Sequence, residues 1–295
     1  MTAVTIAAVN MTVTSNKAQN LARVVSYIEE AAAKGARLIV FPEACLQGYI
    51  DRSPPLGSSE QAKIKRALIE SAEAIPGPGT EALALACART GVVAQVGMLE
   101  HEPNTDTLYN SVAVIGPTGL LGRYRKTHNQ YEFPYFRSGD RLCVIETPVG
   151  RLGPVICSDM DFPEVFRTLT TRGAELITGS AAWPMKGASR EFDYYGWCLE
   201  IAAASGALFN QTWCVVSNQC TAGAYDGKID YYGHSRIVGP DGLVLAEAGW
   251  EEGLVLATAD IRQQILEART ERYFGLNLLE STRPELYAEF RGQTP

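Results

Sequence analysis

The chain has 295 residues, of which 46% are apolar and 20% are charged, with a formal net charge of −7 and a pI near 5.2. This composition is typical of a globular protein with a sizeable core, and it argues against a disordered or fibrous protein and against a nucleic-acid partner. The seven cysteines and three histidines are scattered, without C-x-x-C or H-E-x-x-H, which predicts reduced thiols and no metal site. Without a basic signal segment or eighteen uninterrupted apolar residues, we expect a cytoplasmic protein with no membrane contact.

The first elements are predicted to form a β-α-β unit. Residues 4–9 are short, apolar and rich in β-branched side chains, as in a strand. Ser15 or Asn16 then caps a helix whose apolar residues recur at helical spacing. A second apolar strand at 38–41 stops at Pro42, so Glu43 follows its carboxyl end, the edge where ligands bind in open α/β sheets.

The middle of the chain mixes helices with hairpins. Thr80 is expected to cap a helix that runs to about residue 90, and a strand follows at 92–99. Glycine-rich turns between apolar runs predict three strand-turn-strand hairpins, because glycine supplies the positive φ that such turns need. These turns lie at 116–119, 148–150 and 239–242. Parallel units and hairpins together predict mixed sheets.

The later elements are two helices, each followed by a strand. The helices are predicted at 162–172 and 190–209, and the strands at 175–179 and 214–217. No repeat or linker interrupts the pattern, so we expect a single domain over 1–295. The tail from about residue 261 carries charges and aromatics, and we expect it to take part in subunit contacts.

Cys157 is the first candidate for chemistry. Most free cysteines fill apolar cores, and we interpret six of the seven that way. These are Cys45, Cys87, Cys143, Cys198, Cys214 and Cys220. Cys157 instead ends an apolar run and precedes "SDMDFPE", where a strand-to-helix elbow would lift the thiol into open space and a helix N-terminus would favour the thiolate.

A cysteine nucleophile needs a base. His128 and His234 are possible, but neither has a local pattern that ties it to Cys157. Glu43 is the stronger candidate, since partial burial at the ligand edge would raise its pKa toward neutrality; the alternative is a turn carboxylate.

A cation that stabilises the oxyanion is expected from "RYRKTH". Strand alternation puts Arg125 and Lys126 on opposite faces, and a buried lysine beside acids can stabilise a developing negative charge without a metal. Arg123 and Arg125 are interpreted as a solvated basic patch.

The order of these residues, "VFPE", "YRKTH" and then "CSDMDFPE", resembles the nitrilase superfamily of carbon–nitrogen hydrolases. The stretches "LYNSVAVIGPTGLLGRYRKTH", "FNQTWCVVSNQ" and "YYGHSRIVGPDGLVLAEAG" extend the resemblance over most of the chain. It implies a four-layer α-β-β-α sandwich that forms a homodimer or higher homo-oligomer through one helical face, and no cofactor.

The resemblance also implies roles for individual residues. Cys157 is the nucleophile, Glu43 the general base and Lys126 the oxyanion-stabilising residue, aided by the Ser158 backbone N–H. Glu132 is our choice for the second glutamate usual in this family, the alternative being a surface loop residue.

Substrate contacts are predicted for Tyr49, Trp183 and Asp161. Helix-spaced aromatics are, however, more often core, and this alternative is kept for Trp183 and its companions Tyr194, Tyr195 and Trp197.

The reaction predicted is hydrolysis of a small linear amide through a Cys157 thioester. "DxxFPE" after the cysteine fits amide-cleaving branches better than true nitrilases, which resemble this pattern but usually carry Trp-Glu there. Met160 and Asp161 stand where arginines bind the carboxylate of N-carbamoyl amino acids, so a neutral or cationic amide is favoured. An N-carbamoyl amine hydrolase is the alternative; a nitrile hydrolase or an N-acyltransferase is less favoured, as is a binding protein on the same fold.

Overall fold

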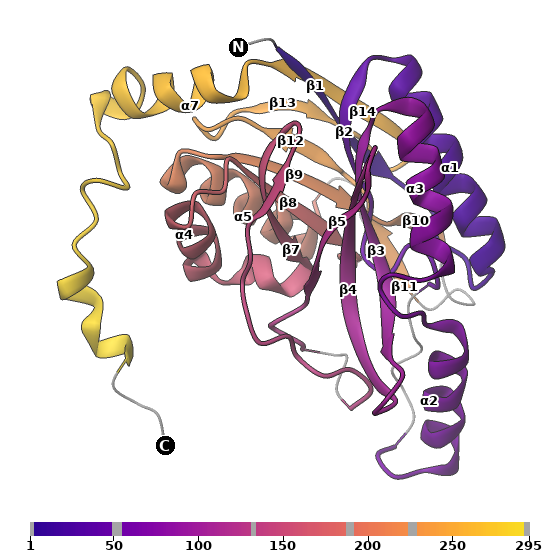
Figure 1. The fold of residues 1–295 in the computed structure, drawn as a ribbon. Coiled ribbons are helices and arrows are strands. Elements are labelled where there is room, and N and C mark those ends of the chain that lie inside the picture. Colours follow the sequence, from indigo (N-terminus) through magenta and orange to yellow (C-terminus); the bar gives the residue numbers. More distant parts are fainter. Residues whose placement is uncertain (1–2, 49–54, 131–133, 187–191, 224–228, 292–295) are drawn as a thin grey trace.

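The computed structural model describes residues 3–48, 55–130, 134–186, 192–223 and 229–291. Two six-stranded sheets dominate this part of the chain (Figure 1). In the first sheet the central strands β1, β2 and β3 run parallel, and β14, β4 and β5 are antiparallel to their neighbours. Its order is β14 (Gly253–Ala259), β1 (Val4–Asn10), β2 (Ala36–Val40), β3 (Val93–Glu102), β4 (Thr107–Gly116) and β5 (Gly119–Arg125).

The second sheet repeats this mixed arrangement. Strands β7, β8 and β9 are parallel, and antiparallel strands flank them on both sides. Its order is β13 (Val244–Glu247), β12 (Arg236–Val238), β9 (Trp213–Asn218), β8 (Leu176–Ala181), β7 (Gly150–Ile156) and β6 (Ile145–Thr147). A separate antiparallel pair joins β10 (Cys220–Gly223) to β11 (Ile229–Tyr232).

Helices cover the outer face of each sheet (Figure 1). On the first sheet lie α1 (Lys17–Ala33) and α3 (Pro78–Thr90); on the second lie α4 (Pro163–Thr171) and α5 (Tyr194–Asn210). The remaining helices are α2 (Ser59–Ser71), α7 (Ile261–Thr270) and the 3₁₀ segments η1 (Cys157–Asp161), η2 (Tyr273–Gly275) and η3 (Pro284–Arg291). None of these helices is long and apolar enough to cross a membrane.

Strand alternation divides the core into layers. In β1, Ala7 and Val9 pack under α1 and α3, whereas Ile6 and Ala8 face the second sheet. The cluster between the sheets combines strands of both, including buried Trp213 of β9. The predicted α-β-β-α sandwich with mixed sheets is therefore confirmed.

Some predicted boundaries differ from the structure. Helix α3 begins at Pro78, because the Thr80 hydroxyl accepts a bond from the Gly77 N–H and closes the first turn from inside the helix. Helix α5 begins only at Tyr194, where the Asp193 carboxylate caps the Gly196 N–H. Helix α2 was not predicted, since Leu68 is its only fully buried residue and its apolar signal is weak.

Candidate active site

Glu43 follows β2 and is completely buried between the two sheets. Its Oε1 accepts hydrogen bonds from Lys126 Nζ at 2.8 Å and Asn110 Nδ2 at 2.7 Å, both from the first sheet's side. Its Oε2 accepts from the Ala182 N–H at 2.9 Å, just past β8 of the second sheet. The backbone of Glu43 is also held, because the Gln219 side chain donates to its carbonyl at 2.9 Å. The carboxylate thus links the two sheets by contacts with residues that directly follow β5 of the first sheet and β8 of the second.

Gly97 of β3 makes this position of the acid possible. A Cβ on Gly97 would lie 2.2 Å from the Pro42 carbonyl oxygen and 2.9 Å from Glu43 Cα. Both distances are shorter than real Cβ contacts, so only glycine lets the turn that carries Glu43 rest directly on the sheet.

Lys126 comes one residue after β5 and is 2% exposed. The predicted split of the basic run is observed, because Lys126 points inward to Glu43 while Arg125 points away. The interpretation of Arg123 and Arg125 as a solvated patch holds only in part, because Arg123 is exposed but Arg125 is partly buried. Both guanidiniums pair with the buried Glu100 carboxylate, and that of Arg125 also stacks 3.7 Å from the centre of the Tyr109 ring.

Cys157 directly follows β7 and has a left-handed backbone, with φ of +47°. Positive φ is uncommon for a residue with a side chain, and it turns the chain sharply from the strand into η1. The preceding Ile156 pairs with Ser180 at the end of β8, the same strand end that leads to the Ala182 N–H bound by Glu43. The thiol is partly exposed. The predicted elbow is present.

The other cysteines divide into two groups. Four are buried, and burial raises the pKa of Cys45, Cys214 and Cys220 to about 12 and that of Cys87 to about 11, as expected for core residues. Cys143 and Cys198 are only partly buried and pack against the margins of core clusters, so the prediction of core filling holds for them in part. Neither has the left-handed backbone of Cys157.

Asp159, two residues after Cys157, was missed by the sequence reasoning. This carboxylate is fully buried, and six groups lie within hydrogen-bonding distance of it. They are the Thr127 N–H and hydroxyl, the His128 N–H and Nδ1, the Tyr124 hydroxyl and the Ile156 N–H, at 2.8–3.3 Å. Burial alone would raise the pKa of Asp159, but the bonds from His128, Ile156 and Tyr124 and the Lys126 charge outweigh it and lower the pKa.

Asp159 therefore ties the segment that carries Lys126 to the elbow that carries Cys157. A second bond supports the tie, because the Ser158 hydroxyl donates to the His128 carbonyl at 2.6 Å. The sequence signal available for Asp159 was its place inside the elbow, where a carboxylate can accept N–H groups of the turn.

His128 and His234, the alternative candidates for the base, have other partners. His128 bonds to Asp159 and stacks on Phe162 with ring centres 4.1 Å apart. His234 Nδ1 lies 2.6 Å from Glu247, and its ring stacks on Tyr232.

The predicted substrate contacts are only partly described. Trp183 is buried next to Ala182, and its indole N–H donates to the Tyr195 carbonyl at 2.7 Å. Asp161 ends η1 and accepts from the Gln130 amide; desolvation, with the Asp159 charge, raises its pKa although Gln130 and Lys126 oppose the change. Tyr49 and Glu132 lie outside the described residues.

The alternative that the helix-spaced aromatics are core applies to Trp183 alone. Tyr194, Tyr195 and Trp197 on α5 are 37–53% exposed.

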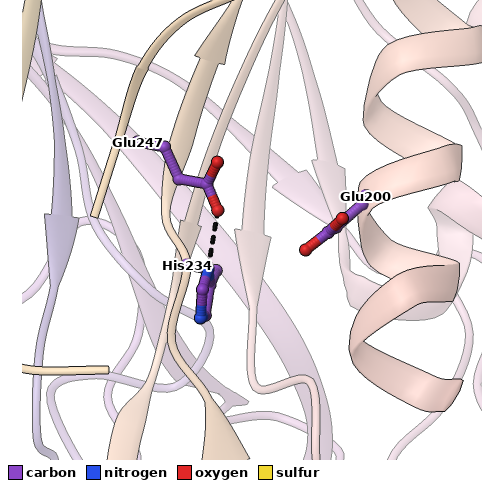
Figure 2. A group of neighbouring side chains, drawn as sticks. All are labelled: Glu200, His234 and Glu247. Atoms are coloured by element: carbon purple, nitrogen blue, oxygen red, sulfur yellow. Dashed lines mark hydrogen bonds and ion pairs between the residues drawn. The ribbon is translucent and has the colours of Figure 1, made fainter. Parts of the chain in front are cut away.

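One group of side chains has the composition of a metal site. The ligand atoms of Glu200, His234 and Glu247 lie within 4.8 Å of one another (Figure 2). However, the buried Arg236 guanidinium lies 3.1 Å from Glu200 and 2.9 Å from Glu247. A metal ion would have to displace this cation, so the group is better described as an ion-pair network that the protein completes itself.

The double sheet, the buried glutamate–lysine pair and the cysteine elbow together define a class of protein, a hydrolase with the nitrilase fold. The comparisons with known proteins agree. The model of the carbon–nitrogen hydrolase family matches residues 5–269, and this chain belongs to that family.

Human omega-amidase NIT2 is 31% identical over 291 residues, which cover 92% of this chain and 96% of the human protein. The crystal structure of Saccharomyces cerevisiae Nit3, a member of branch 10 of the nitrilase superfamily, has a TM-score of 0.77 at 25% identity and covers 92% of this chain and 95% of its own. A carbon–nitrogen hydrolase from Helicobacter pylori G27, 22% identical with 99% of both chains covered, shares the fold with a TM-score of 0.82. The predicted superfamily and the prediction of an amidase-type hydrolase of carbon–nitrogen bonds are confirmed.

Proposed function

We propose that Cys157, Glu43 and Lys126 carry out the hydrolysis by double displacement. The observation that carries the proposal is the 2.8 Å contact of the buried Glu43 carboxylate with Lys126, at the strand edge where the Cys157 elbow begins. A buried acid beside an ammonium can take up and return a proton while the ammonium balances the charge that develops on the substrate.

In the first half-reaction Glu43 accepts the thiol proton, and the Cys157 sulfur forms a bond to the amide carbonyl carbon. The carbonyl oxygen becomes an oxyanion held by Lys126 Nζ and the Ser158 backbone N–H. The tetrahedral intermediate collapses when the carbon–nitrogen bond breaks, and Glu43 returns its proton to the departing amine. A thioester to Cys157 remains.

In the second half-reaction Glu43 deprotonates a water molecule that attacks the thioester carbonyl. The same two donors hold the second oxyanion. The carbon–sulfur bond breaks, the thiolate regains the proton, and the carboxylic acid leaves. Neither half-reaction requires electrons from outside, so atoms and charge balance with water as the only co-substrate.

For the substrate we propose a small linear primary amide with a terminal carboxamide, so that ammonia is released. Support comes from relatives such as human NIT2 that carry the name omega-amidase. Trp183 and Asp161 are proposed to contact the substrate. Trp183 is buried and follows Ala182, whose N–H binds Glu43. Asp161 is partly desolvated and ends the η1 segment that begins at Cys157. From the sequence pattern alone, we propose that Tyr49 contacts the substrate and that Glu132 is the second glutamate of the site.

We also propose that residues 1–295 act as one domain that dimerises through α5. On this outermost layer Trp197, Ile201 and Phe209 are 44–49% exposed, and their spacing places them in a stripe that spans about 120° of the helix circumference. A second copy of the same stripe would cover it by two-fold symmetry. Free thiols at all seven cysteines support the cytoplasm as the location.

The test of the chemistry follows the acyl group. The purified chain is incubated with primary amides and N-carbamoyl compounds, ammonia is measured, and quenched samples are analysed by mass spectrometry for acyl adducts on Cys157. We expect ammonia release with an adduct on the Cys157 peptide, and no adduct in Cys157→Ala. Cys143→Ala is the matched control, because Cys143 is another partly exposed thiol. Ammonia release that persists in Cys157→Ala would contradict the proposal.

A further inference from the structure

We propose that a cavity between the end of α4, the start of β7 and α7 binds a small organic anion, one with a carboxylate or phosphate group on a short apolar part. The cavity has a volume of about 310 Å³. Its polar lining consists of Arg151, Thr170, Glu175, Arg262 and Arg269. This volume is at the lower end of the range for ligand pockets, which suits a small ligand.

The charges around the cavity do not balance. Three guanidiniums face a single carboxylate, that of Glu175. Glu175 already accepts bonds from Arg262 Nε at 2.6 Å and from the Arg151 N–H at 3.0 Å, with Arg151 Nη2 at 3.4 Å. Because Glu175 is buried and engaged on both oxygens, an excess of two positive charges remains at the cavity wall, which attracts an anion.

Two residues of the lining each contain a buried polar atom that has no hydrogen-bond partner among the described residues. They are Arg269 Nε and the hydroxyl of Thr170, a residue that is only 4% exposed. An unsatisfied donor of this kind destabilises the fold, and more so in a charged group, so natural proteins rarely bury one without a ligand or water nearby. Burial also lowers the pKa of Arg269, with Glu175 opposing the change, and an anion next to it would offset that loss of solvation.

The rest of the wall is apolar and limits the kind of anion. Ile265 and Leu266 of α7, Leu279 of the tail and Ala174 complete the lining. Arginine forks recognise carboxylate and phosphate oxygens, whereas the aliphatic side chains favour a hydrocarbon part next to them. A short-chain carboxylate or phosphate ester fits this combination better than an inorganic ion does.

The cavity lies at the opposite end of the sheet from the proposed active site. Arg151 is near the start of β7 and Cys157 directly follows its end, six residues later or about 20 Å along the strand. A ligand in the cavity would contact α7 and the residues at the amino ends of β7 and β8, far from Cys157. The inference therefore does not depend on the proposed mechanism.

The test uses the full chain in an anion-poor buffer. Butyrate, phenyl phosphate and inorganic phosphate are titrated by calorimetry and in thermal unfolding, and chloride at equal ionic strength is the reference. We expect saturable binding of at least one organic anion and a rise in Tm of about 2 °C for each tenfold increase of ligand beyond Kd. The butyrate and phenyl phosphate arms separate a carboxylate ligand from a phosphate ligand. A Tm that follows ionic strength alone would overturn the proposal.

Two variants locate the binding. Arg269→Gln should raise Kd about tenfold or more, because a charge-assisted bond is lost. Thr170→Val should also weaken binding while leaving the Tm of the ligand-free protein equal or higher, since the buried hydroxyl without a partner is removed. Arg66→Gln, an exposed residue of α2, is the control and should bind as the unmodified chain does. Unchanged binding in both Arg269→Gln and Thr170→Val would exclude this cavity.

Discussion

The regions around Glu43 and Asp159 both contain a fully buried carboxylate that ties the first sheet to the second, but their partners differ. Glu43 contacts an ammonium, an amide and a backbone N–H. Asp159 has six neighbouring groups, which come from the segment beside Lys126 and from the end of β7. An acid that faces a cation can exchange a proton during a reaction, whereas an acid saturated with short bonds at lowered pKa is suited to hold two segments in place.

The largest loss of activity is expected from replacing Cys157, which lies close to both carboxylates in the sequence or the fold. Cys157→Ala removes the nucleophile and should lower kcat by on the order of 10⁶-fold. Ammonia release at saturating amide measures the loss. Circular dichroism and Tm should stay close to those of the unmodified chain, because the side chain is small and partly exposed.

Replacing Glu43 should show separately how the acid contributes to stability, by balancing the Lys126 charge, and to catalysis, by transferring protons. Glu43→Gln should lower kcat by about 10²–10⁴-fold and destabilise the fold by about 3–5 kcal/mol, because the buried Lys126 ammonium loses the carboxylate that it contacts at 2.8 Å. In the double variant Glu43→Gln with Lys126→Met we expect much of the stability to return without activity. Urea unfolding and kcat measure the two effects. Parallel recovery of both would contradict the assigned roles.

Asp159→Asn should give a smaller loss, by displacing the elbow. The amide nitrogen would face donors such as the Tyr124 hydroxyl or the Ile156 N–H, which costs about 2–4 kcal/mol of stability. A shift of the thiol by a fraction of an ångström should reduce kcat about 10–100-fold with little change in KM. Tyr124→Phe, which removes only one of the six contacts, is the matched control, and we expect it to lose less than a third of that free energy.

The pH dependence of stability should distinguish Asp159 from its neighbour Asp161. The folded pKa of Asp159 lies below its ordinary value of 3.8, so its carboxylate stabilises the fold above that value and the contribution is lost as the pH falls through the lower folded pKa. The pKa of Asp161 is raised, so its ionisation opposes folding near neutral pH and the penalty disappears as the pH falls below about 4. Urea unfolding of Asp159→Asn and Asp161→Asn at pH 7, 5, 4 and 3 should show differences of opposite sign that both shrink in acid. Differences of the same sign would contradict this assignment.

The sequence carries more information about Glu43, Lys126 and Cys157 than about what holds them. Each comes within three residues of the end of a strand, so strand period and turn residues suffice to place it at an edge. Asp159 could not be recognised, because all of its partners except the Ile156 N–H come from a segment 31–35 residues earlier, and only the folded chain brings them together. The ion pairs of Arg123 and Arg125 could not be predicted for the same reason, because Glu100, which pairs with both, lies on a different strand.

Gly97 has a practical consequence for protein engineering. The turn that carries Glu43 packs so closely against Gly97 that contacts between the two main chains fix the position of the acid. This position therefore does not depend on the side chains that line the site. Even the single methyl group of Gly97→Ala, in contrast, should shift the acid and cost turnover with every substrate alike.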